Sequence, residues 1–73
     1  MNIPSINPQL RKIDQGQVTD YVFVIRAKDI ADVECYIDDK WSNEESMKGL
    51  SVRNARDWWK TLVNQGFERI LTP

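Results

Sequence analysis

The sequence is short of the residues that build most catalytic and metal sites. It has no histidine, one cysteine and three glycines that stand far apart in a chain of 73 residues. Histidine is the usual general base near neutral pH, and one cysteine supplies neither a disulfide within the chain nor a tetrahedral zinc site. Isolated glycines form no phosphate-binding loop. We therefore expect a protein that is not an enzyme and that has no catalytic residues, no cofactor and no metal.

Long apolar runs are also missing. The longest run of aliphatic and aromatic residues is 21–25, whereas a helix needs about 20 apolar residues to cross a bilayer. The first residues show neither the basic start nor the apolar stretch of a signal peptide. We expect no membrane association and a cytoplasmic location, where an unpaired cysteine is normal.

The remaining candidates for chemistry have simpler interpretations. Cys35 sits among acidic residues, which raise the pKa of a thiol and make it less reactive, so we interpret it as a small core residue. The pairs Asp38–Asp39 and Glu44–Glu45 lack the alternating ligands and the glycine of a calcium-binding EF-hand loop. We interpret them as part of a solvated acidic segment.

The net charge of −1 hides an uneven distribution. Residues 29–45 contain seven acidic side chains and one lysine, and we call this segment the acidic block. The segments before and after it are both net basic. The chain is therefore dipolar along its sequence, and the fold decides whether the acidic block lies beside the basic residues or away from them.

The first half of the chain has the pattern of a β-hairpin. A short strand is predicted at residues 10–13 and a turn at 14–17, where Gly16 is free to adopt positive φ. Residues 18–27 are rich in β-branched and aromatic side chains and predict a strand with apolar residues on both faces.

Residues 29–41 fit two patterns. As a strand, the segment points Val33, Cys35 and Ile37 to one face, and as a helix it presents an apolar stripe. The content of valine, cysteine, tyrosine and isoleucine favours the strand. Residues 41–50 are mostly polar and contain a glycine, so they predict a loop.

Residues 52–65 predict an amphipathic helix. Ser51 is a good N-cap because its hydroxyl accepts a hydrogen bond from a free backbone N–H of the first turn. Gly66 is suited to end the helix in the left-handed conformation. The Schellman motif that results places Phe67 against Leu62.

These elements predict an α+β domain. We expect an antiparallel three-stranded meander, or a hairpin, packed against one C-terminal amphipathic helix, with a short last strand at residues 67–71. The domain spans residues 9–73, and residues 1–8, which contain two prolines, form a flexible tail. The alternative is a small two-layer sandwich with a first helix at residues 29–41.

The predicted helix carries the clearest signal for binding. Arg53, Arg56 and Lys60 are spaced to share one face beside the apolar stripe. Trp58 and Trp59 point about 100° apart around the helix, so one of them lies at the rim of the apolar stripe, and we choose Trp58. Arginines beside an aromatic ring suit a protein hot spot or phosphate contacts with base stacking. An ordinary solvated helix face is the alternative interpretation.

We therefore expect a small non-enzymatic protein-interaction or regulatory module that binds another protein or a second copy of itself. The candidate partner-binding residues are Trp41, Arg53, Arg56, Trp58 and Lys60. The alternative is a weak nucleic-acid-binding domain that uses the basic face of the 52–65 helix. The acidic block favours the protein partner, because acidic side chains repel phosphates.

A three-stranded meander followed by a helix resembles, in architecture alone, the DNA-binding domains of plant AP2-type factors and of some phage integrases. Those domains contact DNA with the sheet. Here the third predicted strand carries Glu34 and Asp38, whose charges repel phosphates. The resemblance therefore does not extend to a sheet that reads DNA.

Overall fold

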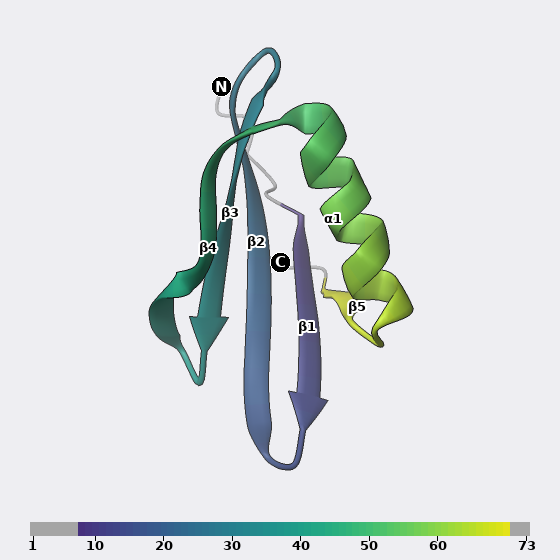
Figure 1. Cartoon of the computed structure of the whole chain (residues 1–73). Coiled ribbons are helices and arrows are strands. Elements are labelled where there is room, and N and C mark those ends of the chain that lie inside the picture. Colours follow the sequence, from purple (N-terminus) through teal and green to yellow (C-terminus); the bar gives the residue numbers. More distant parts are fainter. Residues whose placement is uncertain (1–7, 71–73) are drawn as a thin grey trace, which may run out of the picture.

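The structure is a computed structural model that describes residues 8–70. It is an α+β fold in which one helix packs on a five-stranded antiparallel sheet with the strand order β4-β3-β2-β1-β5 (Figure 1). The predicted class is confirmed, but the sheet has two strands more than the predicted meander. The tail predicted at residues 1–8, apart from Pro8, and the last residue of the strand predicted at 67–71 lie outside the described residues.

The first hairpin joins β1 (Gln9–Asp14) and β2 (Gln17–Ala27) as predicted. Its turn consists of Gln15 and Gly16, both with positive φ, at 52° and 81°. Positive φ at both central residues matches the right-handed twist of the two strands. The alternation of β2 places Tyr21 and Phe23 in the core under the helix, while Val22 is half-buried on the opposite face.

The ambiguous segment is a strand, β3 (Ile30–Ile37), and the alternative of a first helix is wrong. Ala31, Val33 and Cys35 alternate along it and are completely buried, so a strand places all three against the core. The strand ends at a tight turn formed by Asp38 and Asp39, whose φ values are 51° and 66°. Aspartate is one of the few non-glycine residues that adopts this left-handed region readily.

The loop predicted at residues 41–50 is wrong, because these residues belong to strand β4 (Lys40–Ser51). The register with β3 slips twice, so β4 bulges on either side of the pair that Met47 forms with Val33. Side chains replace the missing ladder bonds. The Cys35 N–H donates to Ser46 Oγ at 2.9 Å, and the Gly49 N–H donates to Asp32 Oδ1 at 2.9 Å. Bulges of this kind break the alternation by which a strand is read from sequence.

The helix α1 (Val52–Asn64) begins as predicted and ends one residue earlier than predicted, with Gln65 as its C-cap. The Asn54 N–H donates to Ser51 Oγ at 3.1 Å, which makes Ser51 the N-cap. Gly66 has φ 102°, its N–H donates to the Val63 carbonyl, and the Phe67 N–H donates to the Leu62 carbonyl, both at 3.1 Å. These two bonds form the predicted Schellman motif.

The motif turns the chain into β5 (Glu68–Ile70), which pairs with the free edge of β1. The predicted short last strand is therefore confirmed, with narrower bounds.

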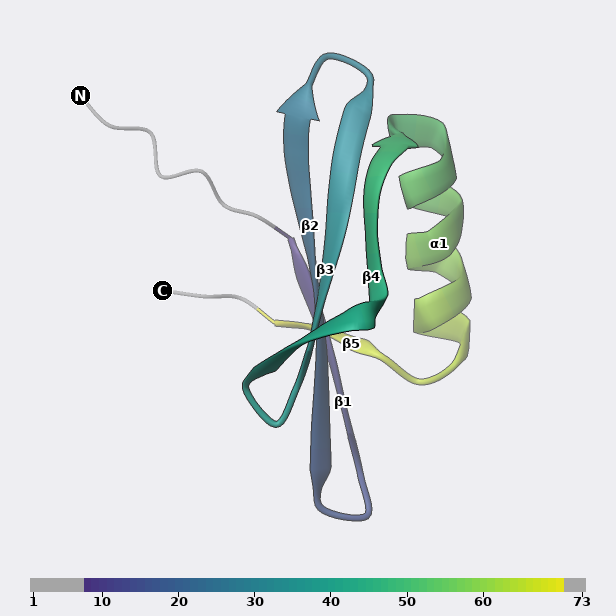
Figure 2. The same cartoon turned by 60° about the vertical axis from the view of Figure 1, so that its left-hand side comes forward.

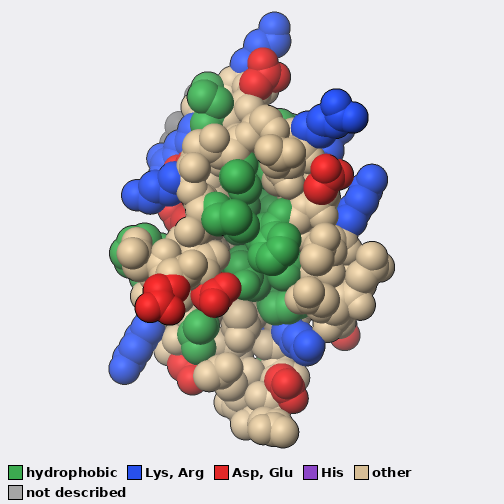
Figure 3. Space-filling view, viewed as in Figure 1, with side chains coloured by type: hydrophobic (Ala, Val, Ile, Leu, Met, Phe, Trp, Pro, Cys, Tyr) green, Lys and Arg blue, Asp and Glu red, His purple; other side chains and the backbone are tan. Residues whose placement is uncertain are grey.

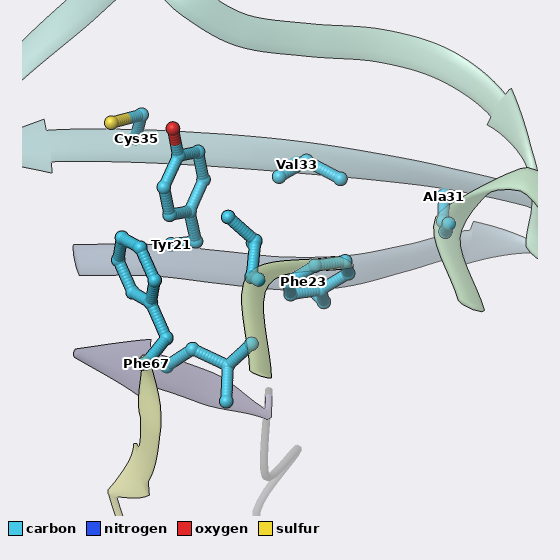
Figure 4. Close-up of a cluster of buried hydrophobic side chains, with 9 residues drawn as sticks. Tyr21, Phe23, Ala31, Val33, Cys35 and Phe67 are labelled. Carbon is cyan, nitrogen blue, oxygen red and sulfur yellow. The ribbon is translucent and has the colours of Figure 1, made fainter. Parts of the chain in front are cut away.

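A single core lies between α1 and one face of the sheet (Figure 2). Tyr21 packs edge-on against Phe67, with ring centroids 5.3 Å apart, and lies between Phe67 and Cys35 (Figure 4). The buried apolar residues are Leu10, Tyr21, Phe23, Ala31, Val33, Cys35, Ala55, Leu62 and Phe67. The other face of the sheet has no helix over it among the described residues. No helix of the described chain is long and apolar enough to cross a membrane.

Candidate functional site

The helix presents two different sides to its surroundings. On the side toward β4, Asn54, Asp57, Trp58 and Thr61 border a hollow of about 340 Å³ that Met47 and Leu50 complete. Figure 3 shows apolar side chains gathered on this face between β4 and α1. We call this the β4 side of α1. The acidic block runs through β3 and β4, so it lies on this half of the sheet.

The opposite side of α1 borders a groove whose apolar wall comes from β2, from α1 and from Pro8, which precedes β1. The wall residues are Pro8, Phe23, Ile25, Val52, Ala55 and Trp59, and the volume is about 390 Å³. Arg56 of α1 and Arg69 of β5 complete the lining. We call this the arginine groove, and this side of α1 the groove side.

The arginine groove exists because two neighbouring strands differ in length. β1 begins at Gln9, which pairs with Val22, and the last bond between the two segments joins the Phe23 N–H to the Pro8 carbonyl at 2.9 Å. β2 continues to Ala27. Among the described residues, its last part therefore has no partner strand on this side, and the space beside it opens onto α1.

Arg56 and Arg69 form no ion pair within residues 8–70. Two other arginines do: Arg11 Nε lies 2.7 Å from Asp20 Oδ1, and Arg26 Nε lies 2.7 Å from Asp32 Oδ2. A guanidinium presents a planar fork of N–H donors that suits a carboxylate or a phosphate. Two such groups beside an apolar wall suit a ligand that joins an anionic group to an apolar one.

Of the predicted basic residues, the structure places only Arg56 in the arginine groove. Lys60 borders a separate shallow hollow with Trp59, and Arg53 is exposed and lines none of the hollows described in the structure. Sequence reasoning missed Arg69. Its side chain faces α1 because β5 pairs Arg69 with the core residue Leu10, and no local pattern reveals that pairing.

The tryptophan beside the basic residues is Trp59, not Trp58. Trp58 lies on the β4 side, edge-on to Tyr21 with ring centroids 6.1 Å apart, and its buried Nε1 has no hydrogen-bond partner among the described residues. Trp59 packs edge-on against Phe23, with centroids 5.0 Å apart. The spacing could have shown this, because Trp59 follows Arg56 by three residues and so shares its face.

Trp41 is remote from these helix residues. It pairs with Tyr36 on the sheet face that α1 does not cover, two residues after the Asp38–Asp39 turn, and it is 50% exposed. In Figures 1 and 2 this turn lies at the end of the sheet away from the start of α1. The structure therefore separates Trp41 from the other four predicted residues, which lie on different sides of α1.

The uncovered sheet face carries charges that are already paired. Asp20 and Asp32 are buried beneath the guanidinium groups of Arg11 and Arg26. The hydrogen bond from the Gly49 N–H and the Arg26 guanidinium lower the pKa of Asp32. Both of these arginines are therefore paired with carboxylates on this face.

Cys35 is free and buried, in agreement with the core interpretation. Burial raises the pKa of its thiol, and burial also raises the pKa of the neighbouring Tyr21 to about 12. Within residues 8–70, no group of three or more acidic or cysteine side chains is placed to hold a metal ion.

Comparisons with protein-family models, with curated proteins and with solved structures gave no match to this chain.

Proposed function

We propose that this protein is a small non-enzymatic protein-interaction module and that the arginine groove binds its partner. The observation that carries the proposal is the pairing of an apolar wall with two guanidinium groups that have no ion pair within residues 8–70. Such a site fits a peptide segment in which a large apolar side chain stands next to a carboxylate. A cytoplasmic location, favoured by the unpaired Cys35, is part of the same proposal.

Nucleic-acid binding is the second candidate, and one observation favours it. Most of the acidic block lies on the β3–β4 half of the sheet, away from Arg69 of β5, although Asp29 adjoins the groove where its carbonyl accepts the Val52 N–H. Stacking of a base needs an accessible ring face, however, and Trp59 is partly buried against Phe23. The groove therefore supports a peptide better than a nucleic-acid strand.

The test is a titration with two peptides that differ only in charge. One alternates aspartate with leucine, and the other alternates asparagine with leucine. We expect the aspartate peptide to bind and the asparagine peptide to bind about threefold to tenfold more weakly, because partly exposed ion pairs contribute modestly. The double variant Arg56→Gln, Arg69→Gln should bind both peptides equally. Heteronuclear NMR at the Trp59 indole N–H reports the binding.

The matched control is Arg53→Gln with Lys40→Gln, which removes two exposed cations that do not line the groove. This control should still distinguish the two peptides. Equal binding of both peptides by the wild type would contradict the role of the arginines. A single-stranded oligonucleotide that binds more tightly than the aspartate peptide, with a steep salt dependence, would favour the second candidate.

A further inference from the structure

Trp41 is the one tryptophan that does not pack against the buried core. Trp58 and Trp59 pack against the buried cluster, whereas Trp41 is 50% exposed at the tip of the β3–β4 hairpin. Tryptophan is the residue type most enriched at the energetic centres of protein interfaces. An exposed indole on a hairpin tip is therefore a good candidate for a group that enters a pocket on a partner.

The tip that carries Trp41 is acidic. Asp38 and Asp39 form the turn, both are exposed, and neither forms an ion pair within the described residues. Asp38 also holds the turn in shape, because its Oδ1 accepts the Val18 N–H at 3.0 Å. The tip, residues 38–41, therefore presents one large aromatic side chain, two carboxylates and the ammonium group of Lys40, which stands between Asp39 and Trp41, on a defined backbone.

The tip and the arginine groove have complementary chemistry. The groove offers an apolar space of about 390 Å³, large enough for one indole ring, between Arg56 and Arg69. The tip offers one indole and two carboxylates. We propose that the occupant of the arginine groove is the β3–β4 tip of a second copy of this chain, with Trp41 against the apolar wall and the Asp38–Asp39 turn facing the two arginines. This inference rests on the proposed function of the groove.

The topology requires that the tip and the groove belong to different copies. The tip lies beside Thr19, which pairs with Ile37, whereas the groove lies at Phe23 and Ile25 on the same strand. Phe23 lies four residues along β2 from Thr19 and Ile25 lies six, which corresponds to about 13 Å and about 20 Å. One copy thus offers a tip at one end and a groove at the other. Such an interface is heterologous and joins copies head to tail, into chains or closed rings.

The experiment uses two full-length variants, each with one half of the interface removed. The tip variant combines Trp41→Ala with Asp38→Asn and Asp39→Asn, since asparagine tolerates positive φ and keeps the acceptor for Val18. The groove variant combines Arg56→Gln with Arg69→Gln. Circular dichroism establishes that both are folded, and sedimentation velocity from micromolar to millimolar concentration measures association.

We expect the wild type to form a concentration-dependent series of oligomers that shortens as salt is raised. Each variant alone should stay monomeric at concentrations at which the wild type already forms oligomers. An equimolar mixture of the two should form dimers that do not grow, because the tip variant supplies only a groove and the groove variant supplies only a tip. Trp41→Ala alone should weaken association by about thirtyfold, as expected for a tryptophan at the centre of an interface.

Two controls define the result. Glu44→Gln with Glu45→Gln removes the same charge from the acidic block outside the tip, and this variant should associate like the wild type. The tip variant keeps an intact groove, so it should still bind the aspartate–leucine peptide. Peptide binding by a wild type that stays monomeric at millimolar concentration would overturn this inference and leave the proposed function intact. A wild type that stays monomeric and binds no peptide would overturn both this inference and the proposed function.

Two further outcomes would contradict the head-to-tail interface. One is a mixture of the two variants that remains monomeric, and the other is a tip variant that still forms oligomers.

Discussion

The two long sides of α1 differ in their contacts and in their charges, although they belong to one helix of 13 residues. The β4 side packs Trp58 toward a bulged strand whose gaps are filled by Ser46 and Asp32, and it carries no basic residue. The groove side places Trp59 and Arg56 beside the last part of β2, which extends past β1. The β4 side therefore has no cation beside its hollow, whereas the groove side has Arg56, which forms no ion pair within residues 8–70.

The residue that lies between these two sides should matter most for stability. Leu62 is 1% exposed, and Leu62→Ala should lower the free energy of unfolding by about 2–5 kcal/mol through lost burial and a cavity. A domain of this size has only about 3–5 kcal/mol from its single core, so the variant should be largely unfolded. Urea denaturation followed by circular dichroism measures it. Val63→Ala, at a neighbouring residue that is 46% exposed, is the control and should change little.

The stability losses of substitutions at Trp58 and at Trp59 compare the two sides of α1 directly. Trp58→Phe removes a buried indole N–H that has no partner, so part of the lost packing is offset by the removal of an unsatisfied donor. We expect Trp58→Phe to be less destabilising than Trp59→Phe by about 1 kcal/mol. Denaturant midpoints of the two variants test this. A larger loss for Trp58→Phe would mean that its N–H has a partner in solution.

Gly66 lies at the end of α1, so a substitution there should destabilise the β4 side and the groove side of the helix equally. Gly66 has φ 102°, and a Cβ placed there meets only the end of the Lys12 side chain, at 3.7 Å. The cost of Gly66→Ala is therefore conformational, and we expect a loss of about 1 kcal/mol. A substitution that raised the melting temperature would show that the helix continues beyond this residue.

As pH falls, we expect the structure on the β4 side of α1 to loosen before that on the groove side. The pKa of Asp32 in the folded protein lies below its ordinary value, so its contribution is present above about pH 4 and is lost as pH falls through the lowered pKa. The Gly49 N–H bond then weakens, and the bulge beside Leu50 loosens. We expect the Trp58 indole resonance to shift in acid before that of Trp59, with a smaller shift in Asp32→Asn. Simultaneous shifts of both resonances would contradict this order.

Local signals explain which elements could be predicted from the sequence. Ser51, Gly66 and Phe67 define the helix ends through contacts within the same turn, so their effect does not depend on distant residues. The alternation of β2 and β3 is equally local. β4 could not be predicted, because its bulges are held by Ser46 and by Asp32, and the latter belongs to another strand.

The same distinction applies to the site. Helical spacing alone was enough to group Arg56 with Trp59, yet the two tryptophans were assigned to the wrong sides. Arg69 enters the groove only because β5 pairs with β1, and Trp41 leaves the helix residues only because the β3–β4 hairpin turns away from them. The first fact depends on pairing between residues near the two ends of the chain, Leu10 and Arg69, which no local pattern encodes. The second depends on strand β4, which its sequence pattern predicted as a loop.

The most direct test of the account is a map of the NMR resonances that move when the aspartate–leucine peptide is added to the wild-type protein. Binding in the arginine groove predicts the largest shifts at the Trp59 indole and at the amides of Phe23 and Ile25, with the Trp58 indole nearly unchanged. Largest shifts at Trp58 and Met47, or no shifts at any peptide concentration, would contradict the assignment of the groove side as the binding surface.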